Sequence, residues 1–386
     1  MKQKLFRLTT IPFSLHILLK GQLGFLNQYY EVIAIASDTD QDIWQILAER
    51  EKVRCCPIHI EREISLRKDI KTLFKLYSLF KKEQPFIVHA NTPKASLLGM
   101  LAAKLAKIPN RIYTVTGLRF EAENGIKRKV LIGMEKLTCW AATKVIPEGQ
   151  GVKKTLLKNK ITNKPIQTIA NGNINGIDTA HFSPGCYSFE QKEKLKNEIG
   201  IPKNAFVFCF VGRLVKDKGI NELVAAFSQL STFNFQLSIK LLLVGPFERE
   251  LDPLLPETEK EIQNHPNIIS VGFQTDVRPY LAISDAFVFP SYREGFPNVV
   301  MQAGAMELPC IVTDINGCNE IIEDGVNGLI IPPKNKEHLR AKMQLLLDNS
   351  QLRNQLKQKA REMITSRYEQ KMVWEALLEE YKSLEM

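Results

Sequence analysis

The chain has 386 residues, of which 44% are hydrophobic and 24% charged, and its formal net charge is +10. This length predicts two domains, and the apolar content suffices for two cores, which excludes a disordered or low-complexity protein. Residues 1–200 carry 32 Lys and Arg against 18 Asp and Glu, whereas residues 201–386 carry 20 against 24. A basic half of this kind can serve an anionic membrane surface, a phosphorylated acceptor or nucleic acid. No nucleic-acid-binding signature accompanies it.

The seven cysteines form no Cys-x-x-Cys pair, and several of them lie in apolar, strand-like runs. We therefore expect buried thiols, a reducing compartment and no metal site. The first residues are typical of a strand rather than a secretory signal, and no apolar stretch reaches 18 residues. These features predict a cytoplasmic protein.

The first half alternates strands with helices. The predicted strands are Leu5–Thr9, Val32–Ala36, Val53–Ile60, Phe86–Ala90, Arg111–Thr116 and Lys144–Ile146. Two helical stripes between them are interpreted as core stripes. Their members are Leu15, Leu18, Leu19, Leu23 and Leu26 in the first, and Leu66, Ile70, Leu73, Phe74, Tyr77 and Phe80 in the second.

A basic cluster stands out on a later helical segment of the first half. It comprises Lys127, Arg128, Lys129 and Lys136, within a pattern whose apolar members are Ile126, Val130, Met134, Leu137 and Ala141. Two interpretations stay open. The cluster is either the solvated face of a core helix or a surface that docks on a membrane.

The pattern restarts after a turn-rich section, 171–185, and a charged helix near 190–199. The predicted strands are Phe206–Val211, Leu241–Val244, Ile268–Val271, Ala286–Phe289 and Cys310–Thr313. Two such series predict an α/β protein with two doubly wound parallel sheets. Ligands of these sheets bind at the carboxyl ends of the strands.

The first polar cluster of the second half follows the strand Phe206–Val211. Gly212 allows a sharp turn, and Arg213, Lys216 and Lys218 precede a helix that begins near Ile220. Cations beside a helix N-terminus suit the binding of a diphosphate, for which Arg provides a planar fork and Lys a point charge. A solvated basic loop is the alternative.

The second polar cluster, Pro290–Ala303, follows the strand Ala286–Phe289. Glu294 and Gly295 are predicted in a turn, Asn298 as the N-cap of a helix and Gln302 one turn further on. Amides at a helix start attract phosphate oxygens, and a carboxylate accepts hydrogen bonds from hydroxyls. This combination favours a polyhydroxylated, anionic ligand.

Over essentially its whole length, the chain resembles the retaining glycosyltransferases of family 4. The family's phosphate clamp is similar to Gly212-Arg213 with Lys218-Gly219. The family's donor signature is similar to Glu294-Gly-Phe-Pro-Asn298 with position 302. His89–Lys94 and Ile112–Gly117 resemble strand ends of bacterial members that build capsule, O-antigen or other lipid-linked polysaccharides. The resemblance implies a GT-B fold, in which two Rossmann-like domains face a central cleft and a C-terminal helix crosses back to the first. The implied parts are an acceptor domain at 1–185, a donor domain at 186–365 and the crossover helix at 366–386.

The resemblance also implies roles for individual residues. Arg213 and Lys218 bind the diphosphate and stabilise its developing charge, while Glu294 holds hydroxyls of the transferred sugar. The remaining donor-binding positions are Gly212, Gly295, Phe296, Asn298, Val299 and Gln302. Expected cleft or acceptor positions are His89, Thr116, Gly117 and Arg119. No metal, no cofactor and no protein nucleophile is expected.

Three positions depart from the family pattern. Gln302 replaces the second glutamate of the donor signature, and Thr116 replaces a histidine commonly placed near the sugar. Thr9–Ser14 replaces the glycine-rich loop after the first strand. His89 either positions a ligand or is a buried, hydrogen-bonded histidine.

Together these features predict an enzyme that transfers a hexose or N-acetylhexosamine, with retention, from a nucleotide diphosphate sugar, expected to be a UDP-sugar, to a lipid-linked saccharide. It would act in cell-surface polysaccharide biosynthesis, at the inner face of the cytoplasmic membrane, through peripheral contact with anionic lipid. Two alternatives stay open: a non-catalytic nucleotide-sugar-binding subunit and a nucleotide-sugar epimerase of the same fold.

Overall fold

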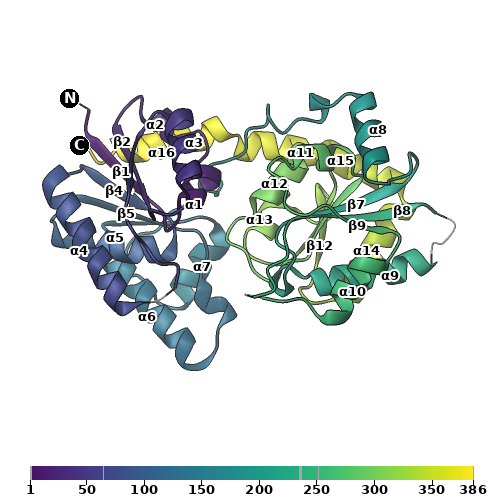
Figure 1. Ribbon diagram of the computed structural model, residues 1–386, viewed down its shortest axis with the longest axis horizontal. Coiled ribbons are helices and arrows are strands. Elements are labelled where there is room, and N and C mark those ends of the chain that lie inside the picture. The colour runs from purple at the N-terminus through teal and green to yellow at the C-terminus, as the bar shows by residue number, and fades with distance from the viewer. Residues whose placement is uncertain (1, 64, 234–236, 251, 386) are drawn as a thin grey trace. The chain divides into compact units, whose positions relative to one another are not determined.

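The computed structural model describes residues 2–63, 65–233, 237–250 and 252–385. The chain forms two compact units (Figure 1). The first comprises Met1–Gly176 together with Gln370–Met386, and the second comprises Ile177–Glu369. Each unit is built on one parallel sheet, as the alternation of strands and helices predicted.

The sheet of the first unit has the strand order β3-β2-β1-β4-β5-β6, and all its pairs are parallel. The strands are β1 (Lys4–Leu8), β2 (Glu31–Ala36), β3 (Arg54–Pro57), β4 (Ile87–Ala90), β5 (Asn110–Val115) and β6 (Lys144–Pro147). Each coincides with a predicted strand, although the edge strand β3 is shorter than Val53–Ile60. The central strands are largely apolar because helices cover both faces of the sheet, although Arg7 of β1 and His89 of β4 are buried polar exceptions.

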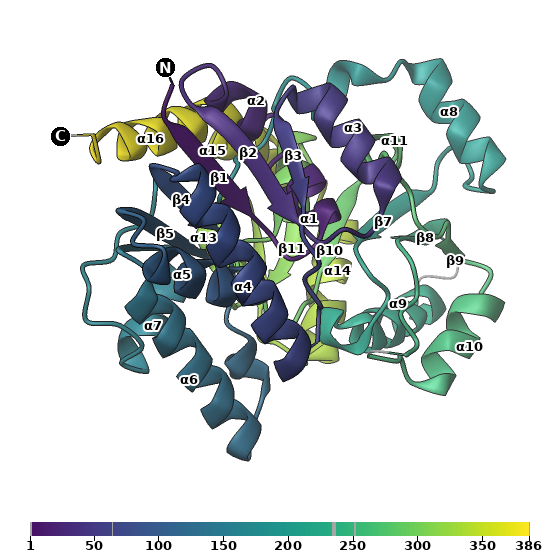
Figure 2. The same ribbon diagram turned by 60° about the vertical axis from the view of Figure 1, so that its left-hand side comes forward.

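The helices of the first unit form two layers (Figures 1 and 2). One layer holds α4 (Leu66–Glu83), α5 (Pro93–Leu105) and α6 (Gly125–Ala141), with α7 (Gln150–Lys158) following β6. The other holds α1 (Pro12–Leu18), α2 (Gln22–Leu26), α3 (Gln41–Glu51) and the C-terminal α16 (Gln370–Lys382). Four members of the first predicted core stripe, Leu15, Leu19, Leu23 and Leu26, are fully buried in this second layer, and Leu18 is half-buried against the same core.

The second predicted core stripe, on α4, is wrong for half of its members. Leu66, Ile70 and Phe74 are 76%, 53% and 65% exposed. The helix instead buries Thr72, Leu76 and Phe80. Both sets repeat every four residues, so each forms one face of a helix, and periodicity does not decide which face meets the sheet.

The sheet of the second unit has the order β12-β11-β10-β7-β8-β9. Its strands are β7 (Phe206–Val211), β8 (Ile239–Val244), β9 (Ile268–Ser270), β10 (Ala286–Phe289), β11 (Cys310–Thr313) and β12 (Gly328–Ile331). The last strand lies beyond the five that were predicted. The α-helices are α8 (Phe189–Glu198), α9 (Ile220–Phe233), α10 (Pro256–Asn264), α11 (Arg278–Ala282), α12 (Asn298–Ala305), α13 (Cys318–Ile321), α14 (Lys336–Asp348) and α15 (Ser350–Tyr368).

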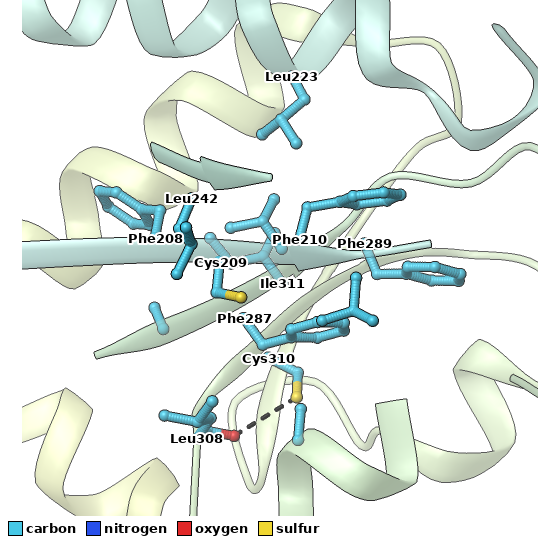
Figure 3. Packing of buried hydrophobic residues seen from close by; sticks show 14 of the residues in the cluster. Phe208, Cys209, Phe210, Leu223, Leu242, Phe287, Phe289, Leu308, Cys310 and Ile311 are labelled. Carbon is cyan, nitrogen blue, oxygen red and sulfur yellow. Dashed lines mark hydrogen bonds between the residues drawn. The ribbon is translucent and has the colours of Figure 1, made fainter. Parts of the chain in front are cut away.

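An aromatic core supports β7 and β10, the two strands that lead into the polar clusters (Figure 3). Phe289 stacks on Phe210 at 5.9 Å between ring centroids and on Phe287 at 6.1 Å. Cys209 is fully buried beside them, and burial raises the pKa of its thiol to about 12. This thiol packs as a small apolar group. The close packing gives the loops after both strands a rigid base.

The boundaries between the units differ from the expected 185/186 and 365/366. The Ile177 N–H donates to the Tyr368 carbonyl at 2.8 Å, and Arg361 Nη2 donates to the Thr179 carbonyl at 2.8 Å. These bonds join residues 177–185 and 366–369 to the second unit. The final helix belongs to the first unit, and the chain passes between the units at 176/177 and 369/370.

Candidate active site

The two polar clusters of the second unit lie together because β7 and β10 are neighbours in its sheet. The Lys218 ammonium forms an ion pair with Glu294 Oε1. Ser291 Oγ donates to the same carboxylate oxygen at 2.6 Å. The side chains of Lys218 and Glu294 are 17% and 15% exposed, so the pair is largely shielded from water. The structure therefore brings together two residues that are 76 positions apart in the sequence.

Two glycines allow the loops around this ion pair to touch through their backbones. Gly219 has φ +71°, and a Cβ there would lie 2.1 Å from the Pro290 carbonyl oxygen. A Cβ at Gly245, after β8, would lie 1.9 Å from the Gly212 carbonyl oxygen. Neither position accepts a side chain without displacing the neighbouring backbone. Gly245 was not singled out from the sequence, although its place directly after a predicted strand was a usable signal.

Arg213 shares the loop after β7 with Lys218 but has a different partner. Its Nη1 lies 2.5 Å from Glu248 Oε2, and its side chain is 47% exposed. Glu248 lies in the loop after β8 and was not predicted as a site residue. The loop that carries both cations is fixed at Asp217, whose N–H donates to Asp252 Oδ2 at 2.7 Å. An exposed cation beside a shielded one is an arrangement that can contact two oxygens of an extended anion.

The helix that follows Glu294 begins differently from the prediction. Pro297 is the N-cap residue of α12, and Asn298 is its first helical residue, so the assignment of Asn298 as N-cap is wrong. The physical reason is that Pro297 adopts the extended conformation required at the cap (φ −74°, ψ 107°). Val299 and Gln302 are both half-buried on this helix.

Gly295 and Phe296 form the turn before α12. The Phe296 side chain is only 6% exposed and contacts Tyr368 at 5.4 Å between ring centroids. A Cβ at Gly317 would lie 2.4 Å from the Gly295 carbonyl oxygen, so the loop after β11 closes directly on this turn. Phe296 therefore anchors the turn, and only its backbone is available to a ligand.

In the first unit, His89 is a structural residue. It is 1% exposed, its Nδ1 lies 2.8 Å from Arg7 Nη1 and 2.5 Å from Tyr381 Oη, and its Nε2 lies 2.7 Å from Thr114 Oγ1. Burial, followed by the charge of Arg7, holds the pKa of His89 well below its ordinary value. Of the two interpretations left open, the structure selects the buried, hydrogen-bonded histidine.

The buried Arg7 was missed in the sequence, where its only signal was one charge within an apolar strand. It is 1% exposed and donates to Tyr381 Oη at 2.5 Å and to Asn91 Oδ1 at 3.0 Å. Among the described residues, Arg7 Nε and Asn91 Nδ2 have no hydrogen-bond partner. They line a cavity of about 20 Å³, which is enough for one water molecule.

The other expected residues of the first unit lie just after β5. Thr116 is half-buried and donates to the Asn91 carbonyl at 3.0 Å. Gly117 has φ +140°, and Arg119 is exposed in the short 3₁₀ turn Arg119–Ala122. The loop Thr9–Ser14 is held by hydroxyls, since the Thr10 N–H donates to Thr92 Oγ1 at 2.7 Å.

Two family models match the chain in its two halves. "Glycosyl transferase 4-like" matches residues 12–148, and "Glycosyl transferases group 1" matches residues 191–363. The capsular polysaccharide biosynthesis glycosyltransferase CapM of Staphylococcus aureus is 33% identical over 383 residues, which cover 99% of this chain and 97% of CapM. The Escherichia coli UDP-Gal:α-D-GlcNAc-diphosphoundecaprenol α-1,3-galactosyltransferase is 32% identical over 274 residues, which cover 70% of this chain and 68% of the relative.

Solved structures share the fold. The Anabaena HepE protein in complex with UDP and glucose aligns with a TM-score of 0.83 at 18% identity, over 99% of this chain and 100% of HepE. WaaG, a glycosyltransferase involved in lipopolysaccharide biosynthesis, aligns with a TM-score of 0.73 at 15% identity, over 97% and 98% of the two chains. The chain therefore belongs to the group 1, family-4-like glycosyltransferases and has their GT-B fold.

Proposed function

We propose that this glycosyltransferase acts in cell-surface polysaccharide biosynthesis and moves a hexose or N-acetylhexosamine, with retention, from a UDP-sugar to a lipid-linked saccharide. The observation that carries the proposal is the shielded Lys218–Glu294 pair at the adjoining ends of β7 and β10. The relatives support its biology. CapM is named for capsular polysaccharide, and the E. coli relative is named for a UDP-Gal donor and a diphosphoundecaprenol acceptor.

The ion pair suits a nucleotide-sugar donor because its two charges serve different parts of that molecule. Lys218 and Arg213 would contact the diphosphate, whose negative charge grows as the sugar leaves. Glu294 would accept hydrogen bonds from sugar hydroxyls, and the amides that begin α12 would face phosphate oxygens. Before the donor binds, each member of the pair compensates the charge of the other, so neither stands alone in a shielded place.

Retention needs no protein nucleophile in this scheme. The bond between the anomeric carbon and the diphosphate oxygen breaks, and the acceptor oxygen bonds to the same face of the sugar. The acceptor's proton passes to the departing diphosphate oxygen. Lys218 and Arg213 would supply the positive charge that a divalent metal supplies in other transferases. Among the described residues, no group of three or more His, Cys, Asp or Glu side chains is arranged to hold a metal ion.

A donor screen by UDP release tests the proposal. The full chain is incubated with single UDP-sugars, membrane lipid extract and EDTA. We expect one UDP-sugar to release UDP in a lipid-dependent reaction that EDTA leaves unchanged, and the product to keep the anomeric configuration of the donor. Loss of activity in EDTA, restored by Mg²⁺, would refute metal independence. Donor binding without UDP release would support the non-catalytic subunit, and conversion of one UDP-sugar into another without acceptor would support the epimerase.

Lys218→Ala tests the role of the ion pair. We expect turnover to fall by about 100-fold or more, because the shielded positive charge proposed beside the leaving group is removed. Lys336→Ala is the control, since Lys336 is an exposed lysine of the same unit that lies outside both polar clusters. Circular dichroism checks that both variants are folded. Near-normal turnover of Lys218→Ala would remove this residue from the mechanism.

The proposed lipid-linked acceptor places the reaction at the inner face of the cytoplasmic membrane. Within the described part of the chain, no helix is long and apolar enough to cross a bilayer. We propose peripheral contact through the basic first unit, because an excess of Lys and Arg suits an anionic lipid surface.

A further inference from the structure

Helix α6 presents an apolar stripe to the outside of the first unit. Ile126, Val130, Leu137 and Trp140 are 82%, 51%, 41% and 59% exposed. Their spacing, with Gly133 between them, alternates four and three residues, so they lie along one line of the helix. We call these four side chains the α6 stripe.

The buried face of the same helix is mixed. Leu131 and Ile132 pack against the core of the unit. Beside them the helix buries Glu135, Thr138, Cys139 and Ala141, and Glu135 accepts a hydrogen bond from Tyr113 Oη at 2.9 Å. An ordinary core helix buries its apolar residues and exposes its polar ones. The outer face of α6 departs from this rule because it carries large apolar side chains beside its lysines. Exposed apolar patches of this kind mark sites of interaction.

Helix α4 carries a second set of exposed apolar residues. It lies in the same layer as α6, and α5 packs against both (Figure 2). The exposed members of this set are Leu66, Ile70 and Phe74, the three residues that were wrongly predicted in the core.

Cations accompany the apolar residues on both helices. Lys129 and Lys136 are exposed and directly precede Val130 and Leu137. Neither forms an ion pair within the described part of the chain. Lys104 Nζ lies 4.1 Å from the centroid of the Trp140 ring. On α4, Arg67, Lys71 and Lys75 are exposed as well.

The charge pattern decides between two occupants of this surface. The four-three spacing would also suit a helix from a second copy of the chain. The positions that flank the stripe are Lys127, Lys129 and Lys136, so two copies would bring lysines against lysines, which disfavours self-association. An anionic bilayer attracts the same lysines, and Trp is favoured at the membrane–water interface.

We propose that the α6 stripe, together with Leu66, Ile70 and Phe74 of α4, is the surface through which this protein docks on an anionic lipid bilayer. The inference rests on the proposed function, in which the acceptor is lipid-linked. The apolar side chains would enter the headgroup boundary, and the lysines would contact lipid phosphates.

Vesicle flotation of the full chain tests the surface. We expect binding to vesicles of phosphatidylcholine with phosphatidylglycerol, and at least tenfold weaker binding to phosphatidylcholine alone. The stripe variant, Ile126→Ser/Val130→Ser/Leu137→Ser, should bind the anionic vesicles at least tenfold more weakly. The lysine variant, Lys129→Gln/Lys136→Gln, should also bind them more weakly, and its binding should depend less on salt. Matched controls in the second unit are Phe189→Ser/Phe233→Ser and Lys194→Gln/Lys336→Gln, whose residues are equally exposed.

Tryptophan fluorescence gives a second readout. Trp140 is 59% exposed, whereas Trp44 is buried and Trp374 half-buried. Brominated lipids in the anionic vesicles should quench the emission of the wild type, and Trp140→Phe should lose most of this quenching. Thermal melts of every variant confirm folding. Flotation of the folded stripe variant at the wild-type level would overturn the proposal.

The remaining outcomes separate this surface from the proposed function. Turnover on a short-chain, water-soluble acceptor should be the same for the stripe variant and the wild type. If the wild type floats with the vesicles, the stripe variant does not, and no acceptor leads to UDP release, the docking surface is supported and the proposed function is contradicted. Normal turnover by a wild type that binds no vesicles would contradict the surface alone. A wild-type dimer that binds no vesicles, and that the stripe variant makes monomeric, would identify a self-interface and overturn the bilayer proposal.

Discussion

Gln302 occupies the second carboxylate position of the donor signature, one turn into α12 and half-buried. Under the proposed function, it faces the ribose hydroxyls with one amide oxygen and one amide nitrogen. Gln302→Glu should lower KM for the UDP-sugar about fivefold, because hydrogen bonds to a charged acceptor are about 1 kcal/mol stronger. The value of kcat should change less, since residue 302 does not face the reacting atoms. Steady-state kinetics check this; an unchanged KM would separate residue 302 from the nucleotide.

Glu135 makes the stability of the first unit depend on pH. Burial raises the pKa of its carboxyl group to about 7, although the hydrogen bond from Tyr113 acts in the opposite direction. The folded pKa is above the ordinary value of 4.5, so the folded state holds the proton more tightly. The resulting contribution to stability is complete below pH 4.5 and is lost as the pH rises through 7.

Glu135→Gln should remove this dependence. Relative to the wild type, the free energy of unfolding of the variant should rise between pH 4.5 and pH 8, by an amount of the order of 3 kcal/mol. Urea unfolding at several pH values measures it, with the exposed Glu257→Gln of α10 as control. His89 titrates in both proteins, so its contribution cancels in the comparison. A difference that does not vary with pH would contradict the buried, protonated carboxyl.

At the scale of elements, backbone contact between the loops after β7 and β10 depends on Gly219. Gly219 and Gly200 both have left-handed backbones, with φ +71° and +75°. A Cβ at Gly200 meets nothing within 4 Å, whereas one at Gly219 would lie 2.1 Å from the Pro290 carbonyl oxygen. Alanine variants at Gly200 and Gly219 therefore separate the cost of a left-handed backbone from the cost of a steric clash.

Gly200→Ala should cost about 1 kcal/mol and keep normal turnover, because only the left-handed conformation is penalised. Gly219→Ala should cost at least twice as much and lower turnover at least tenfold, because the loop that carries Lys218 must move away from β10. Thermal unfolding and UDP release measure both effects. Equal behaviour of the two variants would mean that the loops do not need their backbone contact.

Element positions were predictable where the local signal was strong. The strands from Phe206–Val211 to Cys310–Thr313 are apolar runs bounded by polar turns, and the structure places strands within two residues of each predicted limit. The orientation of helices was harder to predict. On α4 and α6 the exposed and buried faces both contain apolar residues, so periodicity alone assigned half of the α4 stripe wrongly to the core and left the outer face of α6 open. Contacts with the sheet and with α5 decide which face is buried.

At the scale of the whole molecule, the last residues of the chain complete the core of the first unit. Tyr381 of α16 is fully buried and accepts a hydrogen bond from Arg7, which is 374 positions away. Tyr381→Phe should lower the free energy of unfolding by about 1–3 kcal/mol, because a buried guanidinium loses a partner. Urea unfolding measures the loss, and Tyr29→Phe, at a residue 45% exposed, is the control. Equal midpoints for the two variants would show that the Arg7 contact does not stabilise the unit.

The two parallel sheets and the family could be predicted from the amino-acid sequence alone. The alternation of apolar runs, turns and helical patterns predicted two parallel sheets, because backbone preferences and hydrophobic periodicity are local. The spacing of Gly212, Arg213, Lys218 and Glu294 indicated the family, because each motif lies in one short segment. Packing decided the rest. Three contacts join residues that are distant in sequence: Lys218 with Glu294, Arg213 with Glu248, and Arg7 with His89. The exposed faces of α4 and α6 likewise follow from how each helix lies on its sheet, which no local pattern encodes.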